Sequence, residues 1–291
     1  MENEKKDNHE LDNTYYDTLV LSGGSNKTIL TLGALQCAVD NYILEHIKIY
    51  VGTSSGAIIS YMLCIGYTPI ELLVYLCTNQ IFEALQNYSL VNLAHNKGAC
   101  SFNPLQEHLE KITIEKIGYL PTLNDIKEKY DKTLVCVTYN YTEQMTEYLS
   151  WENYPHLPCI TALKMSANLP LVFEKFRYGD SFYIDGAVSD NFPIRYANEI
   201  GKKVIGIYLN GIQKETQDTN ESVLDYFYNL LLIPIIIGTN GQIESVSSKT
   251  NVVTINHEFE FKFFNFNINT QTKLEMFSVG YTEMKNKIFD K

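Results

Sequence analysis

Short apolar runs alternate with segments of helical spacing near the start of the chain. Tyr16–Leu21 has the length and apolar content of a buried strand and stops at the turn-forming residues Ser22–Gly24. The apolar residues of Asn26–Leu44 recur at the spacing of one helix face. A second short strand, Ile47–Val51, is followed by a Gly/Ser turn and a second helical run, Ala57–Ile65. A strand, turn and helix that occur twice in succession predict a parallel sheet with helices on its faces.

The rest of the chain continues the mixture of helices and strands. Residues from about 69 to 130 are expected to be mostly helical, with Asn103 as an N-cap and Pro104 at the first helical position. The later elements are expected at Thr133–Thr138, Met145–Leu149, Ser181–Ile184, Lys203–Leu209 and Val252–Ile255 (strands) and at Cys159–Met165 and Thr272–Ile288 (helices). We find no linker or repeat. We therefore expect a disordered tail over residues 1–14 and a single α/β domain over 15–291.

The longest apolar run is Leu230–Ile237, which contains Pro234. It is too short to span a bilayer, because a membrane helix needs about 20 apolar residues. A buried helix or core strand is the favoured interpretation, ahead of a patch that faces lipid.

Composition and charge exclude several classes of function. The 291 residues include 23 basic and 34 acidic side chains, for a net charge of −11. Nucleic-acid binding needs clustered basic residues and is therefore not expected. The six cysteines form no CxxC pattern and no zinc-binding cluster with histidine. The N-terminus is polar and lacks the apolar core of a secretory signal, so we expect a cytoplasmic location.

The strongest local motif is the GxSxG pattern Gly52-Thr53-Ser54-Ser55-Gly56. In a sharp turn from strand to helix, such a pattern holds the central serine in a strained conformation, and the glycines give the backbone room. Ser54 would lie at the positive end of a helix, where an oxyanion is stabilised. The same five residues also fit a plain turn with Ser54 as the N-cap, and the local sequence does not choose between these interpretations.

A nucleophilic serine needs a group that accepts its proton, which is usually histidine. None of the six histidines is expected at a strand end beside a turn. Asp185 is expected there, because it follows the apolar run Ser181–Ile184 and precedes Gly186. Taken alone, Asp185 also fits an ordinary Asp-Gly turn.

The glycine-rich turn after the first strand has the sequence LSGGSNKT. A P-loop would need glycine where the chain has Leu21 and Asn26, and neither Gly23 nor Gly24 begins a GxGxxG pattern. The turn therefore predicts a nest of backbone N–H groups directed at an anion. Beside Ser54 this nest would form an oxyanion hole, in which the loss of one donor lowers the rate by about 10²–10³.

These elements, in this order, resemble the patatin-like phospholipase family. Met165–Pro170 is similar to the family's Ala-Ser-x-x-x-Pro segment, and Asp185–Pro193 is similar to its DGG/DGA-x-x-x-N-x-P motif. The resemblance covers roughly residues 16–287. It implies a three-layer α/β/α fold with a mostly parallel central sheet, and a Ser–Asp dyad that works without histidine.

Carried over by position, the resemblance implies that Ser54 is the nucleophile and Asp185 the base. The implied oxyanion donors are the N–H groups of Gly23, Gly24 and Ser25. The remaining residues of the matching motifs are Lys27, Gly52, Gly56, Gly186, Asn191 and Pro193. The implied activity is hydrolysis of fatty-acyl esters of phospholipids or other lipids through an acyl-enzyme. We expect no metal, calcium or other cofactor, and transient peripheral contact with a membrane.

Two departures from the family pattern keep alternatives open. Ser25 replaces the third glycine of the family's loop and Thr28 replaces the last, at positions where a positive φ would suit neither residue. A weakly active or inactive protein that binds lipid or a protein partner therefore stays open. So does a Ser-His-Asp esterase in which His257 or His156 reaches Ser54.

Overall fold

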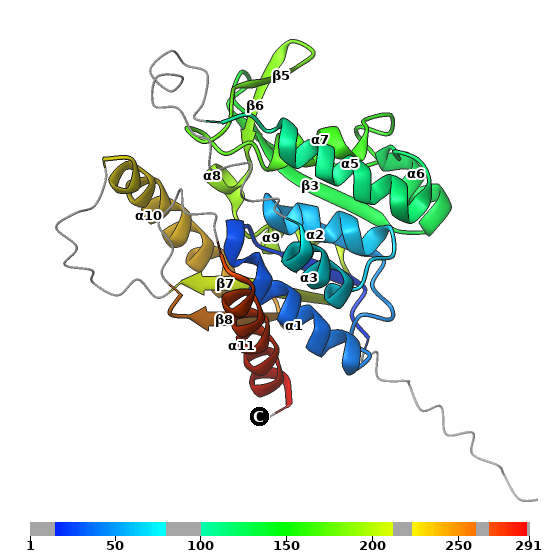
Figure 1. Cartoon of the computed structure of the whole chain (residues 1–291), viewed down its shortest axis with the longest axis vertical. Helices are drawn as coiled ribbons and strands as arrows, with labels where there is room; N and C mark the ends of the chain where they lie inside the picture. The colour runs from blue at the N-terminus through cyan, green and yellow to red at the C-terminus, as the bar shows by residue number, and fades with distance from the viewer. Residues whose placement is uncertain (1–14, 80–99, 212–222, 260–267, 290–291) are drawn as a thin grey trace, which may run out of the picture.

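A mixed sheet of eight strands forms the centre of the protein in the residues that the structure describes (Figure 1). The computed structural model describes residues 15–79, 100–211, 223–259 and 268–289, so the tail expected over 1–14 lies outside it. The strand order is β5-β6-β3-β2-β1-β7-β8, and β4 pairs with β3 beside this path. Strands β3, β2, β1, β7 and β8 run parallel, whereas β4 and β6 run antiparallel to β3. The expected mostly parallel sheet is confirmed.

The strands lie where the apolar runs predict them. Their bounds are Thr18–Leu21 (β1), Ile49–Thr53 (β2), Thr133–Asn140 (β3), Met145–Leu149 (β4), Phe176–Tyr178 (β5), Ser181–Asp185 (β6), Val204–Gly211 (β7) and Thr250–His257 (β8). The short β5, which pairs with β6, was not predicted.

Helices cover both faces of the sheet and complete the expected three layers. They are α1 (Thr28–Asp40), α2 (Ser55–Cys64), α3 (Pro69–Thr78), α5 (Asn103–Ile117), α6 (Leu123–Tyr130), α7 (Cys159–Ser166), α8 (Ala187–Asp190), α9 (Ile194–Ile200), α10 (Val223–Glu244) and α11 (Thr270–Phe289). Side chains alternate between the faces. Leu19 and Leu21 of β1 pack in the core that includes α1, α2 and α11, whereas Val20 packs with residues of α9. In Figure 1, α1, α2, α3 and α11 lie in front of the sheet and α9 lies behind it.

Two glycines bring α1 and α11 into direct backbone contact. A Cβ added at Gly33 would lie 1.9 Å from the carbonyl oxygen of Phe277, and one added at Gly280 would lie 1.9 Å from that of Leu30. A side chain at either position would force the helices apart. Gly33 and Gly280 therefore have a packing role between these two helices.

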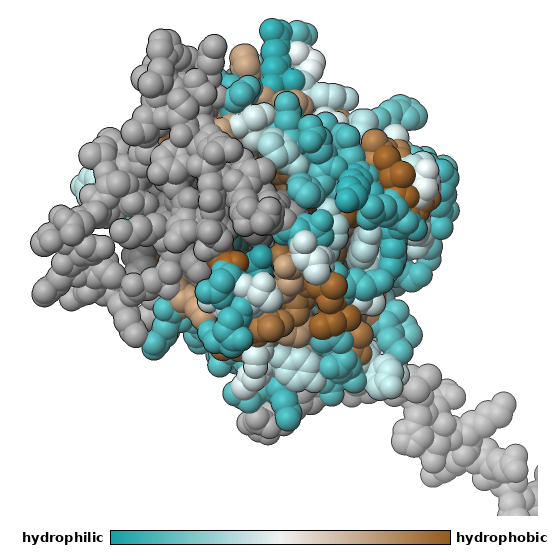
Figure 2. Space-filling view, in the orientation of Figure 1, coloured by the Kyte–Doolittle hydropathy of each residue, from teal (hydrophilic) through white to brown (hydrophobic). Residues whose placement is uncertain are grey.

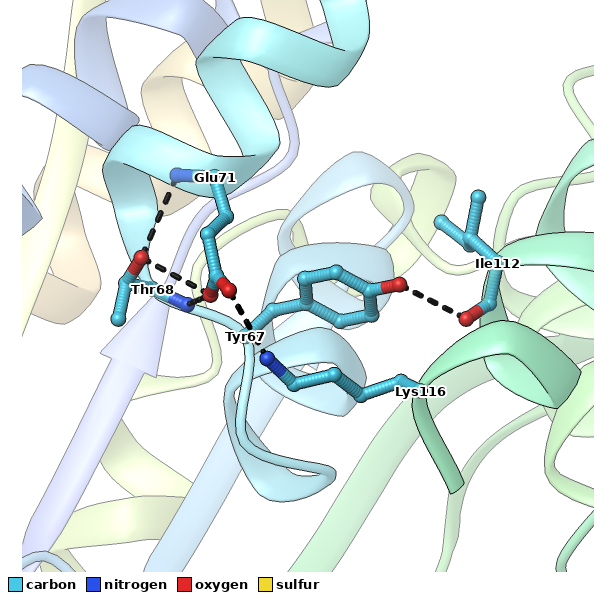
Figure 3. A network of polar contacts seen from close by, with 5 residues as sticks. All are labelled: Tyr67, Thr68, Glu71, Ile112 and Lys116. Carbon is cyan, nitrogen blue, oxygen red and sulfur yellow. Dashed lines mark hydrogen bonds and ion pairs between the residues drawn. The ribbon is translucent and has the colours of Figure 1, made fainter. Parts of the chain in front are cut away.

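A polar network joins the start of α3 to α5 (Figure 3). Thr68 and Glu71 form a capping box, in which the Glu71 carboxylate accepts the Thr68 N–H at 2.7 Å. Lys116 of α5 reaches the same carboxylate at 3.0 Å. The Tyr67 hydroxyl donates to the carbonyl of Ile112 at 2.8 Å. These contacts hold the start of α3 against α5.

Two expectations about helices were wrong. Asn103 is the first residue of α5 and not its N-cap, which is Phe102 in a helical backbone conformation without a side-chain cap. Residues 230–237 belong to α10 and do not form a buried core element, because Leu230, Ile233 and Ile237 are exposed. Pro234 lies within this helix.

Apolar side chains are also exposed on α3. Figure 2 shows hydrophobic surface near the middle of the viewed face, where α3 lies among its neighbouring helices. On α3 itself, Ile70 and Val74 are both exposed, one helical turn apart. The surface therefore carries apolar side chains on both α3 and α10.

Candidate active site

The turn from β2 to α2 holds Ser54 in a strained backbone conformation. Its φ is 55° and its ψ is −124°, a region that costs a non-glycine residue about 1–3 kcal/mol. Both glycines of the motif are required by close packing. A Cβ at Gly52 would lie 2.5 Å from the Gly56 carbonyl oxygen, and one at Gly56 would lie 2.4 Å from that of Leu21. The expected strand–serine–helix turn is thus formed.

Asp185 lies directly against Ser54, although the two residues are 131 positions apart. The Ser54 hydroxyl donates to Oδ2 of Asp185 at 2.6 Å. Asp185 is the last residue of β6, which pairs with β3, the neighbour of β2 in the sheet. The Ala187 N–H donates to the other carboxylate oxygen at 2.8 Å and fixes the carboxylate plane. Gly186 allows the turn, because a Cβ there would lie 2.3 Å from the Val137 carbonyl oxygen.

Burial changes the acidity of this carboxyl group. Asp185 is only 1% exposed, and this desolvation raises its pKa from 3.8 to about 6. The hydrogen bonds from Ser54 and from the Ala187 N–H stabilise the carboxylate and limit the rise. A carboxylate with a pKa near 6 is a stronger base than an ordinary aspartate and is still ionised at neutral pH.

Two neighbouring side chains anchor the serine turn. The Ser54 N–H donates to the Ser166 hydroxyl at 3.0 Å, and that hydroxyl donates to the Val137 carbonyl at 2.6 Å. Thr53 donates to the carbonyl of Asp190 at 2.9 Å and so ties the end of β2 to α8. Sequence reasoning placed Ser166 in a family segment but assigned it no role. Only the fold brings α7 beside the serine.

The glycine-rich turn lies beside Ser54, but two of its three expected donors are occupied. A Cβ at Gly23 would lie 3.3 Å from Ser54 Cβ. The Gly23 N–H donates to the Asn191 carbonyl at 3.1 Å, and the Gly24 N–H donates to the Ser55 hydroxyl at 3.0 Å. Among the described residues, the Ser25 N–H has no hydrogen-bond acceptor. Of the three predicted oxyanion donors, the Ser25 N–H is therefore the one that no described acceptor occupies.

The departures from the family loop have different structural costs. Ser25 has a φ of 51°, so the serine occupies a conformation that favours glycine, as expected. Thr28 has a φ of −56°, which is ordinary for a helix, so this position does not require a positive φ and the threonine is unstrained. Lys27 lies between them as the N-cap of α1, and burial lowers the pKa of its ammonium group. Pro193 stands at the N-cap of α9, and its carbonyl accepts the Ala197 N–H.

The histidines proposed as alternative bases lie elsewhere. His257 ends β8, three strands from β2, which corresponds to about 14 Å across the sheet. Burial lowers its pKa to about 4, so it is neutral at pH 7. His156 is exposed in the turns before α7. Within the described residues, no histidine is hydrogen-bonded to Ser54 or Asp185.

No metal site or membrane span accompanies this arrangement in the part of the chain that is described. There, no three His, Cys, Asp or Glu side chains are grouped so that they could ligate a metal ion. None of the described helices combines the length and apolar composition that crossing a bilayer requires. All six cysteines are free thiols, and five of them are buried.

The geometry is suited to acyl transfer. A serine hydroxyl at a helix N-terminus is hydrogen-bonded to a buried carboxylate, and the Ser25 N–H in the adjacent turn has no acceptor in the part of the chain that is described. The hydroxyl can attack a carbonyl carbon once the carboxylate accepts its proton. The amide can stabilise the charge that develops on the carbonyl oxygen.

Comparison with known proteins shows which family the sequence of this chain matches. A family profile described as patatin-like phospholipase matches residues 19–198, a range that includes Ser54 and Asp185. The chain is 34% identical over 196 residues to a protein of Invertebrate iridescent virus 6 named probable lipid hydrolase 463L, a match that covers 65% of this chain and 67% of that protein. It is 26% identical over 250 residues to the protein R571 of Acanthamoeba polyphaga mimivirus, a match that covers 82% and 83% of the two chains.

Solved structures resemble the fold. VipD from Legionella pneumophila superposes with a TM-score of 0.58 at 14% identity over 94% of this chain and 66% of its own. The type III effector protein ExoU superposes with a TM-score of 0.52 at 15% identity over 93% of this chain and 52% of its own. The chain thus spans only part of the length of both proteins, and the likeness concerns the fold alone.

Proposed function

Because the chain belongs to the patatin-like phospholipase family, we propose that it hydrolyses fatty-acyl esters of phospholipids or other lipids through a Ser54–Asp185 dyad. The observation that carries the proposal is the 2.6 Å hydrogen bond between the serine hydroxyl and the buried carboxylate. The match to a viral protein named as a probable lipid hydrolase supports a lipid ester as the substrate class.

In the first step, Ser54 Oγ attacks the ester carbonyl carbon while Asp185 accepts the hydroxyl proton. The tetrahedral intermediate then collapses. The bond to the alcohol oxygen breaks, and Asp185 returns the proton to the leaving lysolipid or alcohol. The product is an acyl-enzyme on Ser54.

In the second step, water attacks the acyl-enzyme, and Asp185 accepts its proton. Collapse of the second intermediate releases the fatty acid and returns the proton to Ser54 Oγ. In both steps the Ser25 N–H and the positive end of α2 stabilise the oxyanion. No metal ion or other cofactor takes part in this scheme.

The proposal is tested by covalent labelling together with product analysis. The wild-type protein is incubated with a fluorophosphonate probe, with p-nitrophenyl esters, and with a mixed phospholipid extract. The proposal expects labelling at Ser54 and release of fatty acid and lysolipid. His257→Ala and His156→Ala serve as controls and should retain turnover. A large loss in either control would support the Ser-His-Asp alternative instead.

One observation favours a second candidate function, a weakly active or inactive protein that binds lipid or a protein partner. The Gly23 and Gly24 N–H groups are both occupied, and Ser25 stands at a positive φ. A wild-type protein that binds lipid vesicles but neither labels with the probe nor releases fatty acid would support this candidate.

The pH dependence of turnover follows from the raised pKa of Asp185. The base must be ionised, so kcat/KM should rise with pH and reach its plateau above the pKa of about 6. An ordinary aspartate would give a midpoint near pH 4. The measurement is kcat/KM for a soluble ester between pH 4 and 8. The acidic limb should persist in the His257→Ala protein, and a midpoint near pH 4 would contradict the proposed environment of the base.

We also propose that α10 makes peripheral contact with the lipid surface. Tyr226, Leu230, Ile233 and Ile237 recur at heptad-like spacing along this helix, and all four are exposed. Helix α10 packs against α8, which begins two residues after Asp185 (Figure 1). The net charge of −11 disfavours attraction to anionic lipids, so adsorption through apolar side chains is the expected mode.

Charged substitutions on α10 should weaken this contact. Removing apolar burial at Ile233 and Ile237 costs about 1.5–3 kcal/mol per side chain, so Ile233→Glu/Ile237→Glu should lower affinity for phosphatidylcholine vesicles by about 100-fold or more. Hydrolysis of a soluble ester should be unchanged. Ile70→Glu/Val74→Glu on α3 is the matched control, with the same charge change and the same spacing. Equal loss in both variants, or loss only in the control, would assign the contact to another surface.

A further inference from the structure

Two hydroxyl side chains bridge the glycine-rich turn to the nucleophile helix. The Gly24 N–H donates to Ser55 Oγ at 3.0 Å. Ser55 Oγ lies 2.7 Å from Thr28 Oγ1, and the Thr28 hydroxyl also contacts the Ser25 carbonyl oxygen. Ser55 is the first residue of α2 and directly follows the nucleophile. The two contacts of Ser55 Oγ link residues that are 27 and 31 positions apart in the chain.

The Thr28 hydroxyl is the donor in both of its contacts. It donates to Ser55 Oγ, and it shares the same proton with the Ser25 carbonyl, because a carbonyl can only accept. Ser55 Oγ therefore accepts both the Gly24 N–H and the Thr28 hydroxyl. The result is one connected chain of contacts that joins the Gly24 N–H, Ser55, Thr28 and the Ser25 carbonyl.

This chain of contacts binds the turn on both sides of the Ser25 N–H. It holds the N–H of the preceding residue and the carbonyl of Ser25 itself, and so it fixes the peptide units around a residue at a φ of 51°. The family's glycines provide no side chain for this purpose. Here Thr28 stands at one of those positions and supplies a hydroxyl without backbone strain.

We propose that Ser55 and Thr28 are positioning residues that hold the Ser25 N–H where the oxyanion forms. The inference rests on the proposed hydrolase function and adds two residues to that site. Because the oxyanion exists only in the transition state and the tetrahedral intermediates, loss of this positioning should lower kcat and leave KM nearly unchanged.

The test is a double-mutant cycle on a soluble ester. Ser55→Ala and Thr28→Val each remove one hydroxyl and should each lower kcat by about 10- to 100-fold, since a small misplacement in an active site costs up to about 10²-fold. KM should change less than about threefold. The double variant should be no worse than the more damaging single variant, because either change breaks the same chain. Thr28→Ser keeps the hydroxyl and should retain most of the activity.

Ser60→Ala is the matched control. Ser60 lies in the same helix as Ser55 and is buried, and its hydroxyl has no partner among the described residues. This variant should keep the wild-type kcat. Single variants with kcat within twofold of wild type, effects that multiply in the double variant, or a loss confined to KM would overturn the positioning role. A wild-type protein with no turnover and no labelling of Ser54 would instead overturn the proposed function and this inference with it.

Discussion

Replacing Asp185 with asparagine is expected to lower ester turnover by roughly 10⁴-fold, because the Ser54 hydroxyl then has no base to accept its proton. The same substitution is expected to stabilise the fold at pH 7. Burial raises the pKa of Asp185 from 3.8 to about 6, so the folded protein carries an unfavourable buried charge at neutral pH. The difference corresponds to no more than about 3 kcal/mol, because asparagine also loses charge-assisted hydrogen bonds.

The pH dependence of this stability difference has a definite sign. The raised pKa means that the folded state binds the Asp185 proton more tightly than the unfolded state. This contribution to stability is complete below about pH 4 and is lost as the pH rises through about 6. The Tm of Asp185→Asn should therefore exceed that of wild type by several degrees above pH 6, and the difference should shrink toward pH 4.

Asp190→Asn provides the control for the Asp185 substitution. Asp190 is also buried, and burial raises its pKa, but its carboxylate accepts a hydrogen bond from Tyr148 and not from Ser54. Its substitution should keep turnover within about tenfold of wild type. An Asp185→Asn protein that retains turnover, or one whose Tm is lower than wild type throughout pH 4 to 8, would contradict the role and environment proposed for Asp185.

Replacing Ser54 with alanine is expected to lower turnover by roughly 10⁵-fold or more and to abolish labelling by a fluorophosphonate. The fold should be kept. Alanine retains the Cβ and the N–H that donates to Ser166, and no neighbour is displaced. Both activities are measured on protein whose circular dichroism spectrum and Tm match wild type.

Ser54→Gly separates catalysis from backbone strain. Glycine adopts the φ of 55° without the cost that a Cβ carries, so this variant should be about 1 kcal/mol more stable than Ser54→Ala and equally inactive. Turnover or labelling that survives in both variants would place the nucleophile at another residue.

The central elements of the site could be predicted because their signals are local. Tyr16–Leu21 and Ile47–Val51 are continuous apolar runs that end at glycine-containing turns, and they correspond to β1 and β2. Asp185 stood out because an apolar strand ended in Asp-Gly. Strand runs and turn residues depend on neighbours within a few positions, so one sequence carries them.

The surface of α10 could not be predicted in the same way. The run LLLIPIII is apolar on every side, and such a run is as consistent with a buried element as with a helix that lies on the surface. Helix α10 packs against α8 and α9, and this packing decides which of its sides is buried and which is exposed.

The hydrogen-bond partners and backbone conformation of the glycine-rich turn could not be predicted either. The sequence LSGGSNKT identifies a nest of N–H groups but not their partners. Asn191 and Ser55 occupy two of these groups from segments far away in the chain. The substitutions Ser25 and Thr28 looked alike in sequence, yet only Ser25 takes a positive φ.

The sequence alone therefore predicts most of the strands and helices, the strand–turn–helix around Ser54 and the carboxylate at a strand end, since these follow from periodicity and turn chemistry over short distances. Tertiary packing decides that the hydroxyl and the carboxylate touch, that burial raises the pKa of Asp185 to about 6, and that hydroxyls from α1 and α2 clamp the glycine-rich turn. Contact, burial and hydrogen-bond partnership are properties of segments brought together across the sheet, and they do not exist until the chain has folded.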